Sequence, residues 1–231
     1  MVGAIYLDER TLVLLKPSTV ILSMRVSILQ ISYLPWLGFF EQMQRSDQFV
    51  LYDDVQFTRR DWRNRNRIRV EEGSTWLTVP VIQKNKYKQN LLETKIDNST
   101  SWKRKHLETI RCHYSKAPFF DLYFPWCEKV YNSEWNYLLD LSLETVQYLK
   151  EELKIKTPIV RSSELGGEGN KTQRLLSICK KLGATHYLSG ESARNYILDS
   201  EFSNQNIKLE YQEYQHPEYP QRYEGFVPFL S

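Results

Sequence analysis

The sequence predicts an α/β fold, a mostly parallel sheet flanked by helices with a helical insertion between two β-α-β halves. Apolar, β-branched runs at residues 26–31 and 48–55 lie on either side of a helix-spaced segment at 36–47. Residues 102–153 have a helical pattern, and strand and helix patterns alternate again from residue 157. The short connections favour parallel strands with a right-handed crossover.

The elements follow in order along the chain. Helical spacing of Trp36, Phe39 and Met43 predicts the first helix, and a further strand is expected at 75–81, after a turn around Gly73. The insertion is expected at about 101–153, with Ser133 as a cap of its last helix. A strand at 157–163, a glycine-rich loop, an amphipathic helix at 171–183 and strands at 186–190 and 207–214 complete the prediction.

Length and composition predict a single domain at 24–231, preceded by an extension at residues 1–23. The apolar runs of that extension are short and are broken by Lys16 and Pro17, so they fit neither a signal peptide nor a membrane span. Three separated cysteines show no metal-ligand spacing and predict reduced thiols in a cytoplasmic protein. No metal is expected, and no motif identifies a cofactor.

Residues 53–70 contain six arginines and three aspartates, a net charge of +3 that equals the formal charge of the whole chain. Because the rest of the chain is balanced, this pattern favours a local anion site over a nucleic-acid surface. Guanidinium groups suit carboxylate or phosphate, and asparagine amides can bind sugar hydroxyls. An extended segment would place the arginines on one face, a helix would stack two of them, and a solvated edge strand is the alternative without a ligand. The candidates are Arg63, Asn64, Arg65, Asn66 and Arg67.

Three residues are candidates for acid–base chemistry. Asp53 and Asp54 follow a strand, which predicts side chains on opposite faces, one toward a ligand and one paired with arginine. A cap or salt bridge is the structural alternative. His106 shares a helix face with Trp102 and Ile110 close to lysines, which favours a neutral imidazole and predicts a general base, with a hydrogen-bonded core histidine as the alternative.

Ligands of open α/β sheets bind at the carboxyl ends of strands. Four predicted strand ends are rich in polar or small residues, and two of them open into loops whose backbone amides can approach an anion. No GxGxxG, GxxxxGKS or GxSxG motif occurs, so neither a standard nucleotide fold motif nor a hydrolase nucleophile elbow is present. The binding candidates at these ends are Tyr33, Trp36, Gln56, Ser162, Ser163, Lys171, Ser189, Gly190 and Arg194, with Arg174 as a further charge partner.

The segments "YLPWLGFFE", "WRNRNRI", "SWKRKHLETI" and "KTQRLLSICKKLGATHYLSGESARNYI" occur in an order that resembles the WbqC-like family of bacterial proteins over about residues 26–231. Two features depart from the family pattern: Ile31 and Ser32 stand where relatives often have Gln-Pro, and relatives usually continue beyond "FVPFLS". The resemblance implies sugar modification during synthesis of O-antigen or other surface polysaccharides, with transfer of an amino-acid-like or acyl group.

Residues and resemblance together predict a transferase that forms an amide or ester on a nucleotide-linked or lipid-linked sugar. In this hypothesis, Arg65, Arg67 and Asn66 bind the anion and hydroxyls, His106 removes a proton, and Asp54 orients the attacking group. The acyl or aminoacyl donor is not specified by the sequence. The alternative is a non-catalytic module that binds a sugar nucleotide or RNA for a partner enzyme. Direct membrane insertion is not expected.

Overall fold

The computed structural model describes residues 23–59, 61–84, 86, 88–195 and 197–231, so the expected extension at 1–23 lies outside the described residues except for Ser23. The predicted α/β fold is confirmed. Five strands form one parallel sheet in the order β5-β2-β1-β6-β7. They are β1 (Arg25–Leu29), β2 (Gln48–Leu51), β5 (Ile159–Arg161), β6 (His186–Ser189) and β7 (Lys208–Tyr211).

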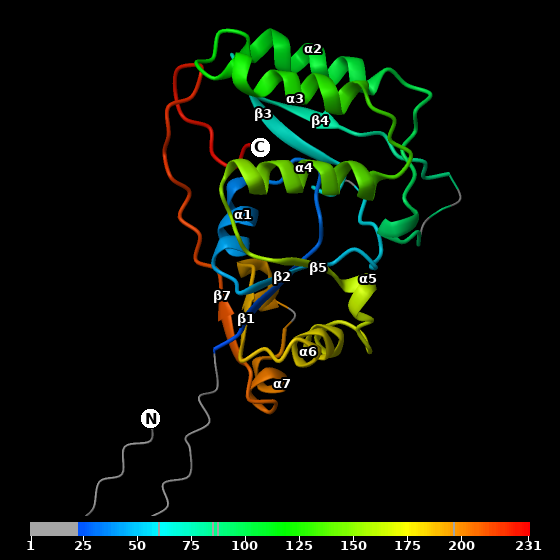
Figure 1. Ribbon diagram of the computed structural model, residues 1–231, viewed down its shortest axis with the longest axis vertical. Coiled ribbons are helices and arrows are strands. Elements are labelled where there is room, and N and C mark those ends of the chain that lie inside the picture. The colour runs from blue at the N-terminus through cyan, green and yellow to red at the C-terminus, as the bar shows by residue number, and fades with distance from the viewer. Residues whose placement is uncertain (1–22, 60, 85, 87, 196) are drawn as a thin grey trace, which may run out of the picture.

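Helices cover both faces of this sheet, as Figure 1 shows. Because successive side chains of a strand point to opposite faces, the core consists of two apolar clusters, one on each face of the sheet. Val26 and Ile28 pack with Ile178 in the first cluster, and Phe49 and Leu51 pack in the second. The first cluster includes α6 (Thr172–Lys181) and α7 (Asp199–Ser203), and the second includes α1 (Leu37–Gln44) and α4 (Leu138–Glu152). The sheet is therefore buried on both sides, as expected of parallel strands.

The strand expected at 75–81 is present as β4 (Gly73–Thr78), but it belongs to a separate sheet. It pairs antiparallel with β3 (Arg65–Val70), and Gly73 makes the turn with φ of 104°. The arginine-rich segment is thus extended from Arg65, which decides between the two conformations left open by the sequence. This hairpin lies between the α4 layer and the pair α2 (Trp102–Tyr114) and α3 (Phe120–Asn132) (Figure 1).

The prediction that Ser133 caps the start of the last helix of the insertion is wrong. Ser133 ends α3, because its backbone N–H donates to the carbonyls of Lys129 and Val130 and its hydroxyl donates to the Lys129 carbonyl at 2.7 Å. The helix α4 begins at Leu138, after Tyr137. A serine between two helical patterns is compatible with either role, and the hydrogen bonds decide it.

The segment 212–231 forms no helix or strand and runs from β7 back to the hairpin (Figure 1). Gln212 donates to the Gly38 carbonyl at 2.7 Å, Leu230 is buried, and the Ser231 N–H donates to the Arg67 carbonyl at 2.9 Å. This segment therefore joins the parallel sheet to β3. The remaining short elements are η1 (Leu91–Glu93), α5 (Ser162–Leu165) and η2 (Glu191–Asn195). Among the described helices, none has the length and apolar character needed to cross a bilayer.

Candidate functional site

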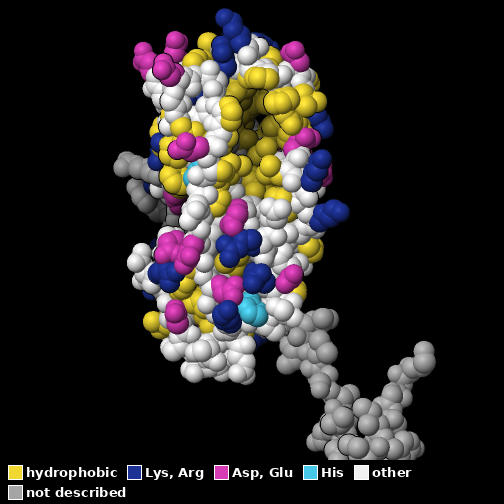
Figure 2. All heavy atoms as spheres, turned by 90° about the vertical axis from the view of Figure 1, so that its left-hand side faces the viewer, with side chains coloured by type: hydrophobic (Ala, Val, Ile, Leu, Met, Phe, Trp, Pro, Cys, Tyr) yellow, Lys and Arg dark blue, Asp and Glu magenta, His cyan; other side chains and the backbone are white. Residues whose placement is uncertain are grey.

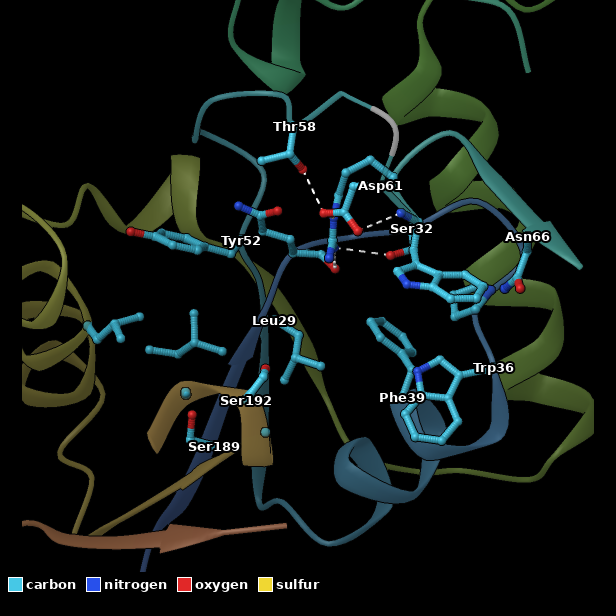
Figure 3. A pocket seen from close by; sticks show the side chains of 18 of the residues that line it. Leu29, Ser32, Trp36, Phe39, Tyr52, Thr58, Asp61, Asn66, Ser189 and Ser192 are labelled. Atoms are coloured by element: carbon cyan, nitrogen blue, oxygen red, sulfur yellow. Dashed lines mark hydrogen bonds and ion pairs between the residues drawn. The ribbon is translucent and has the colours of Figure 1, made fainter. Parts of the chain in front are cut away.

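The candidate site is a pocket that opens at the carboxyl ends of β1 and β6 (Figure 3). From β1 the chain adds β2 and β5 on one side, and then adds β6 and β7 on the other. The neighbours β1 and β6 therefore mark the topological switch point, where ligands of open α/β sheets bind. A cavity of about 780 Å³ lies there, lined by Leu29 and Gln30 at the end of β1 and by Ser189 and Gly190 at the end of β6.

Aromatic side chains form much of the wall. They come from distant parts of the chain: Trp36, Phe39, Tyr52, Trp62 and Phe229. Trp36 packs edge-on against Phe229 with ring centroids 5.5 Å apart, so the C-terminal segment helps to hold the first loop in place. Flat apolar walls of this kind suit a nucleobase or the apolar face of a sugar ring.

An acid and an arginine face this cavity together (Figure 3). The Nε of Arg63 lies 3.4 Å from Asp61 Oδ2, and its Nη1 donates to the Gln30 carbonyl at 2.8 Å and to Ser32 Oγ at 3.1 Å. Thr58 donates to the same carboxylate at 2.8 Å. Burial alone would raise the pKa of Asp61, but the Arg63 charge and these hydrogen bonds hold that pKa below its usual value. The pocket thus offers an ionised carboxylate beside a fixed cation.

The loops after β5 and β6 contribute the rest of the polar lining. Lys171 lines the cavity and precedes the first residue of α6, with φ of 47°, a conformation that non-glycine residues rarely adopt. It lies next to the N-terminus of that helix, where the helix dipole favours negative charge, although the Gln173 amide already donates to the Asn170 carbonyl at 3.1 Å. Ser189, Gly190 and Ser192 line the opposite side after β6. An anionic ligand would meet an ammonium group and helix amides here.

Of the residues predicted from sequence, the pocket brings together Trp36, Arg63, Asn66, Lys171, Ser189 and Gly190. Phosphate-like and hydroxyl-bearing groups fit this set, as expected of guanidinium, ammonium and hydroxyl donors. The amide nitrogen of Asn66 already donates to the Leu34 carbonyl, so Asn66 also fixes the first loop.

Asp53 and Asp54 do not line the pocket, and they do not separate to opposite faces as expected. Asp53 is fully buried, accepts from Arg161 Nε at 2.5 Å and accepts from the Ser163 amide at 3.0 Å and hydroxyl at 2.9 Å. Asp54 pairs with Arg174. The Ser162 hydroxyl lies 2.6 Å from Asp54 Oδ1 and 3.1 Å from Asp53 Oδ1, so it bridges the two acids. These residues join β2 to β5 and form the structural salt bridges that the sequence allowed as an alternative.

His106 lies in the core, away from the pocket wall. Its Nε2 is 3.1 Å from the Thr78 carbonyl, which can only accept, so this nitrogen carries the proton. Its Nδ1 then accepts from the Tyr33 hydroxyl at 3.1 Å, and Tyr33 in turn bonds to Tyr131. Burial lowers the pKa of His106 to about 4, so the imidazole is neutral, as expected. Both nitrogens are occupied, which is the arrangement of a hydrogen-bonded core histidine.

The other predicted residues lie outside the pocket. Asn64 is buried and donates to the Val79 carbonyl at 2.7 Å, while Gln56 is exposed at a bridge to Asn90. Arg194 lies over the ring of Tyr211, 4.0 Å from its centroid, and pairs with Glu191. Five further predicted residues do not line the pocket and contact other side chains of the fold: Tyr33, Arg65, Arg67, Ser162 and Ser163.

A second hollow, of about 740 Å³, lies between α2–α3 and the C-terminal segment. Figure 2 shows its largely hydrophobic lining in the upper part of the molecule. Its residues include Phe119, Phe120, Tyr123 and Leu230. It lies apart from the polar groups of the first pocket.

Sequence reasoning missed several lining residues. The sequence does not distinguish Asp61 from the other two aspartates of residues 53–70, although Asp61 carries the carboxylate of the pocket. Thr58 and Ser32 bond to this pair and had no distinguishing pattern. Phe229 lies almost 200 residues from Trp36, and no local signal links them.

Metal-binding groups are not gathered at this site. Across the described residues, no three His, Cys, Asp or Glu side chains are grouped so that they could hold a metal ion. The three cysteines are free thiols, with Cys112 exposed, Cys127 half-buried and Cys179 buried.

Comparison with known proteins identifies the family. The model of the WbqC-like protein family matches residues 30–231. The chain belongs to the WbqC-like family. An uncharacterized protein of Mycobacterium tuberculosis (strain ATCC 25618 / H37Rv), Rv1507c, is 36% identical over 209 residues, which is 90% of each chain. No solved structure matches this WbqC-like chain. The matched residues include the hairpin and the strands β2, β5, β6 and β7 of the parallel sheet, and they begin directly after β1.

Proposed function

We propose that this protein is a cytoplasmic transferase that forms an amide or ester on a nucleotide-linked sugar during synthesis of bacterial O-antigen or another surface polysaccharide. The observation that carries the proposal is the pocket at the switch point, where aromatic walls, Arg63, Lys171 and the Asp61 carboxylate face one cavity of about 780 Å³. A base can stack on the aromatic wall, phosphates can approach Lys171 and the α6 amides, and sugar hydroxyls can donate to Asp61.

In the proposed reaction, an amine or hydroxyl of the sugar bonds to the carbonyl carbon of an activated acyl or aminoacyl donor. The bond between that carbonyl and the donor's leaving group breaks, and the proton of the attacking group passes to the leaving group or to water. Asp61 is the residue that can orient the attacking group, because its low pKa keeps it an acceptor at neutral pH. His106 has no part in this scheme.

The binding step is tested by thermal unfolding with UDP-, GDP- and dTDP-linked sugars. A ligand at about a hundred times its dissociation constant stabilises the folded state by about 2.7 kcal/mol. Lys171→Ala should weaken binding about tenfold, as expected for loss of one phosphate contact. Lys180→Ala, at the last turn of the same helix, is the matched control and should bind as the wild type does. Equal losses in both variants, or no stabilisation by any sugar nucleotide, would contradict the proposal.

A non-catalytic sugar-nucleotide module is the second candidate. One observation favours it: among the described residues that line the pocket, Asp61 is the single carboxylate and is ion-paired, and neither His nor Cys is present. The two candidates separate when the bound sugar nucleotide is incubated with activated acyl and aminoacyl donors. Formation of an amide or ester that is lost in Asp61→Asn supports the transferase, and tight binding without any product supports the module.

A further inference from the structure

A second set of aromatic and cationic side chains lies on the β3–β4 hairpin beside the pocket. Residues opposite each other in an antiparallel pair share a face, and Arg67 is opposite Trp76. Trp62 packs on Trp76 with ring centroids 5.1 Å apart. Both indoles are unusually open, with 38% of Trp62 and 43% of Trp76 exposed. We call Trp62, Arg65, Arg67 and Trp76 the hairpin platform.

The two arginines of the hairpin platform lie over its indoles. The Arg65 Cζ is 4.3 Å from the Trp76 ring centroid, and the Arg67 Cζ is 5.6 Å and 5.7 Å from the centroids of Trp62 and Trp76. Stacking uses the face of a guanidinium and leaves its in-plane N–H groups able to bind an anion. The Nε of Arg67 is covered and has no acceptor among the described residues.

Arg69, two positions after Arg67 in β3, has a structural role and differs from the platform arginines in burial and in its hydrogen bonds. It is almost fully buried and donates to the carbonyls of Val70, Gly73 and Glu224 at 2.5, 2.8 and 2.6 Å. The C-terminal segment thus covers the Arg69 end of the hairpin. The hairpin platform, at the other end, combines two exposed indoles with two half-buried arginines.

The hairpin platform is continuous with the pocket, because Trp62 belongs to both. A transferase of the proposed kind brings two substrates together, and the pocket accounts for one. Exposed indoles can stack on the apolar faces of pyranose rings, and guanidinium groups bind carboxylates. A long polyanion fits less well, since the chain has a net charge of only +3 and a pI of about 8.6.

We propose that the hairpin platform is a subsite for an acidic saccharide, with a pyranose ring on Trp62 or Trp76 and a sugar carboxylate on Arg67. This inference rests on the proposed function, in which the saccharide is part of the second substrate. It assigns a role in binding to Trp62 and Trp76, which lie outside the residues predicted from sequence.

The test measures binding to the full chain by isothermal titration calorimetry. The acidic probes are trigalacturonic acid and a hyaluronan tetrasaccharide, and maltotriose is the neutral probe. Both acidic probes should bind at least tenfold more tightly than maltotriose. Arg67→Gln and Trp76→Ala should each weaken the acidic probes at least tenfold, whereas Arg104→Gln, an exposed arginine on α2, should leave them unchanged. Arg67→Gln, whose side chain does not line the pocket, should not change sugar-nucleotide affinity by more than about twofold.

Three results would overturn the inference: no binding of either acidic probe, equal binding of maltotriose, or acidic binding that survives both platform variants. Tighter binding of a ten-nucleotide oligouridine, with affinity falling steeply as salt rises, would assign the surface to nucleic acid instead. The proposed function fails separately, when no sugar nucleotide binds the pocket although the acidic probes still bind the hairpin platform. Circular dichroism of Arg67→Gln and Trp76→Ala verifies that both variants are folded.

Discussion

Two carboxylate–arginine clusters lie after β2, and they differ in what their polar atoms face. Asp53 is fully buried, and both its oxygens are taken by Arg161, Ser162 and Ser163. Asp61 is also paired, with Arg63, but this pair lines a cavity. Both acids have a lowered pKa. The residue type and the direction of the pKa shift are therefore the same in the two clusters, and only exposure to a cavity distinguishes the structural cluster from the candidate site.

The largest expected effect comes from removing the buried charge of the structural cluster. Asp53→Asn removes the charge that pairs with Arg161 and replaces one acceptor oxygen by an NH2 group, so we expect the free energy of unfolding to fall by about 3 kcal/mol. Urea denaturation with linear extrapolation measures it. Glu164→Gln is the matched control, since Glu164 is exposed and accepts only from the Arg161 amide at 3.4 Å among the described residues. Equal losses in both variants would break the comparison.

The contribution of Asp53 to the free energy of unfolding should depend on pH. Burial tends to raise the pKa of Asp53, but Arg161 and Ser163 lower it below the reference value of 3.8. A carboxyl with a depressed folded pKa contributes stability that is present above its unfolded pKa and is lost as pH falls through the folded value. The difference between wild type and Asp53→Asn should therefore shrink below about pH 4. A difference that stays constant down to pH 2 would contradict this origin.

A comparable loss is expected for His106, without an effect on the pocket. His106→Ala removes two buried hydrogen bonds and leaves a cavity beside Trp102, which should cost about 3 kcal/mol. Sugar-nucleotide affinity and any turnover, measured below the unfolding transition, should stay at wild-type values. A fall in turnover at unchanged stability would return His106 to the mechanism.

His106 also predicts how stability changes with acid. Its folded pKa of about 4 lies below the reference value of 6.5, because burial disfavours the charged imidazolium. The unfolded chain then binds a proton that the folded chain does not, so stability falls as pH decreases from 6.5 to 4. This group alone accounts for about 3 kcal/mol over that range. The pH dependence should be flatter in His106→Ala.

An intermediate effect is expected at the pocket wall. A Cβ placed on Gly38 would overlap the ring of Trp36, so Gly38→Ala must move that ring from the wall. We expect sugar-nucleotide affinity to fall about tenfold, which is about 1.4 kcal/mol. Calorimetric titration measures it. Alanine normally stabilises a helix relative to glycine by up to about 1 kcal/mol, so a gain of that size with unchanged affinity would contradict the placement of Trp36.

The smallest effect is expected at Arg194. Its side chain is exposed, pairs with Glu191 on the surface and lies outside the cavity. Arg194→Ala should leave both the thermal midpoint and the sugar-nucleotide affinity unchanged, because exposed ion pairs contribute little. Weaker binding by this variant would extend the site along η2.

The sequence predicts the main elements because their periodicity is local. Apolar spacing identifies β1, α1 and α6, and the switch-point rule directs attention to the loops that hold Ser189 and Lys171. Which strand pairs with which depends on residues far apart in the sequence. The sequence therefore predicts the strand β4 but not that it forms a separate sheet with β3. The roles of Asp53 and Asp61 could not be separated for the same reason, since Arg161 lies 108 residues from Asp53.

The residues that line the pocket lie far apart in the sequence, so the pocket forms late during synthesis of the chain. Its wall includes residues from Ile28 to Phe229, so a ribosome-bound chain that still lacks the last of these has an incomplete pocket wall. Ligand binding at this pocket can therefore stabilise the folded chain only after translation has passed Phe229. Until then, β1 and β2 depend on their own packing to escape aggregation and proteolysis.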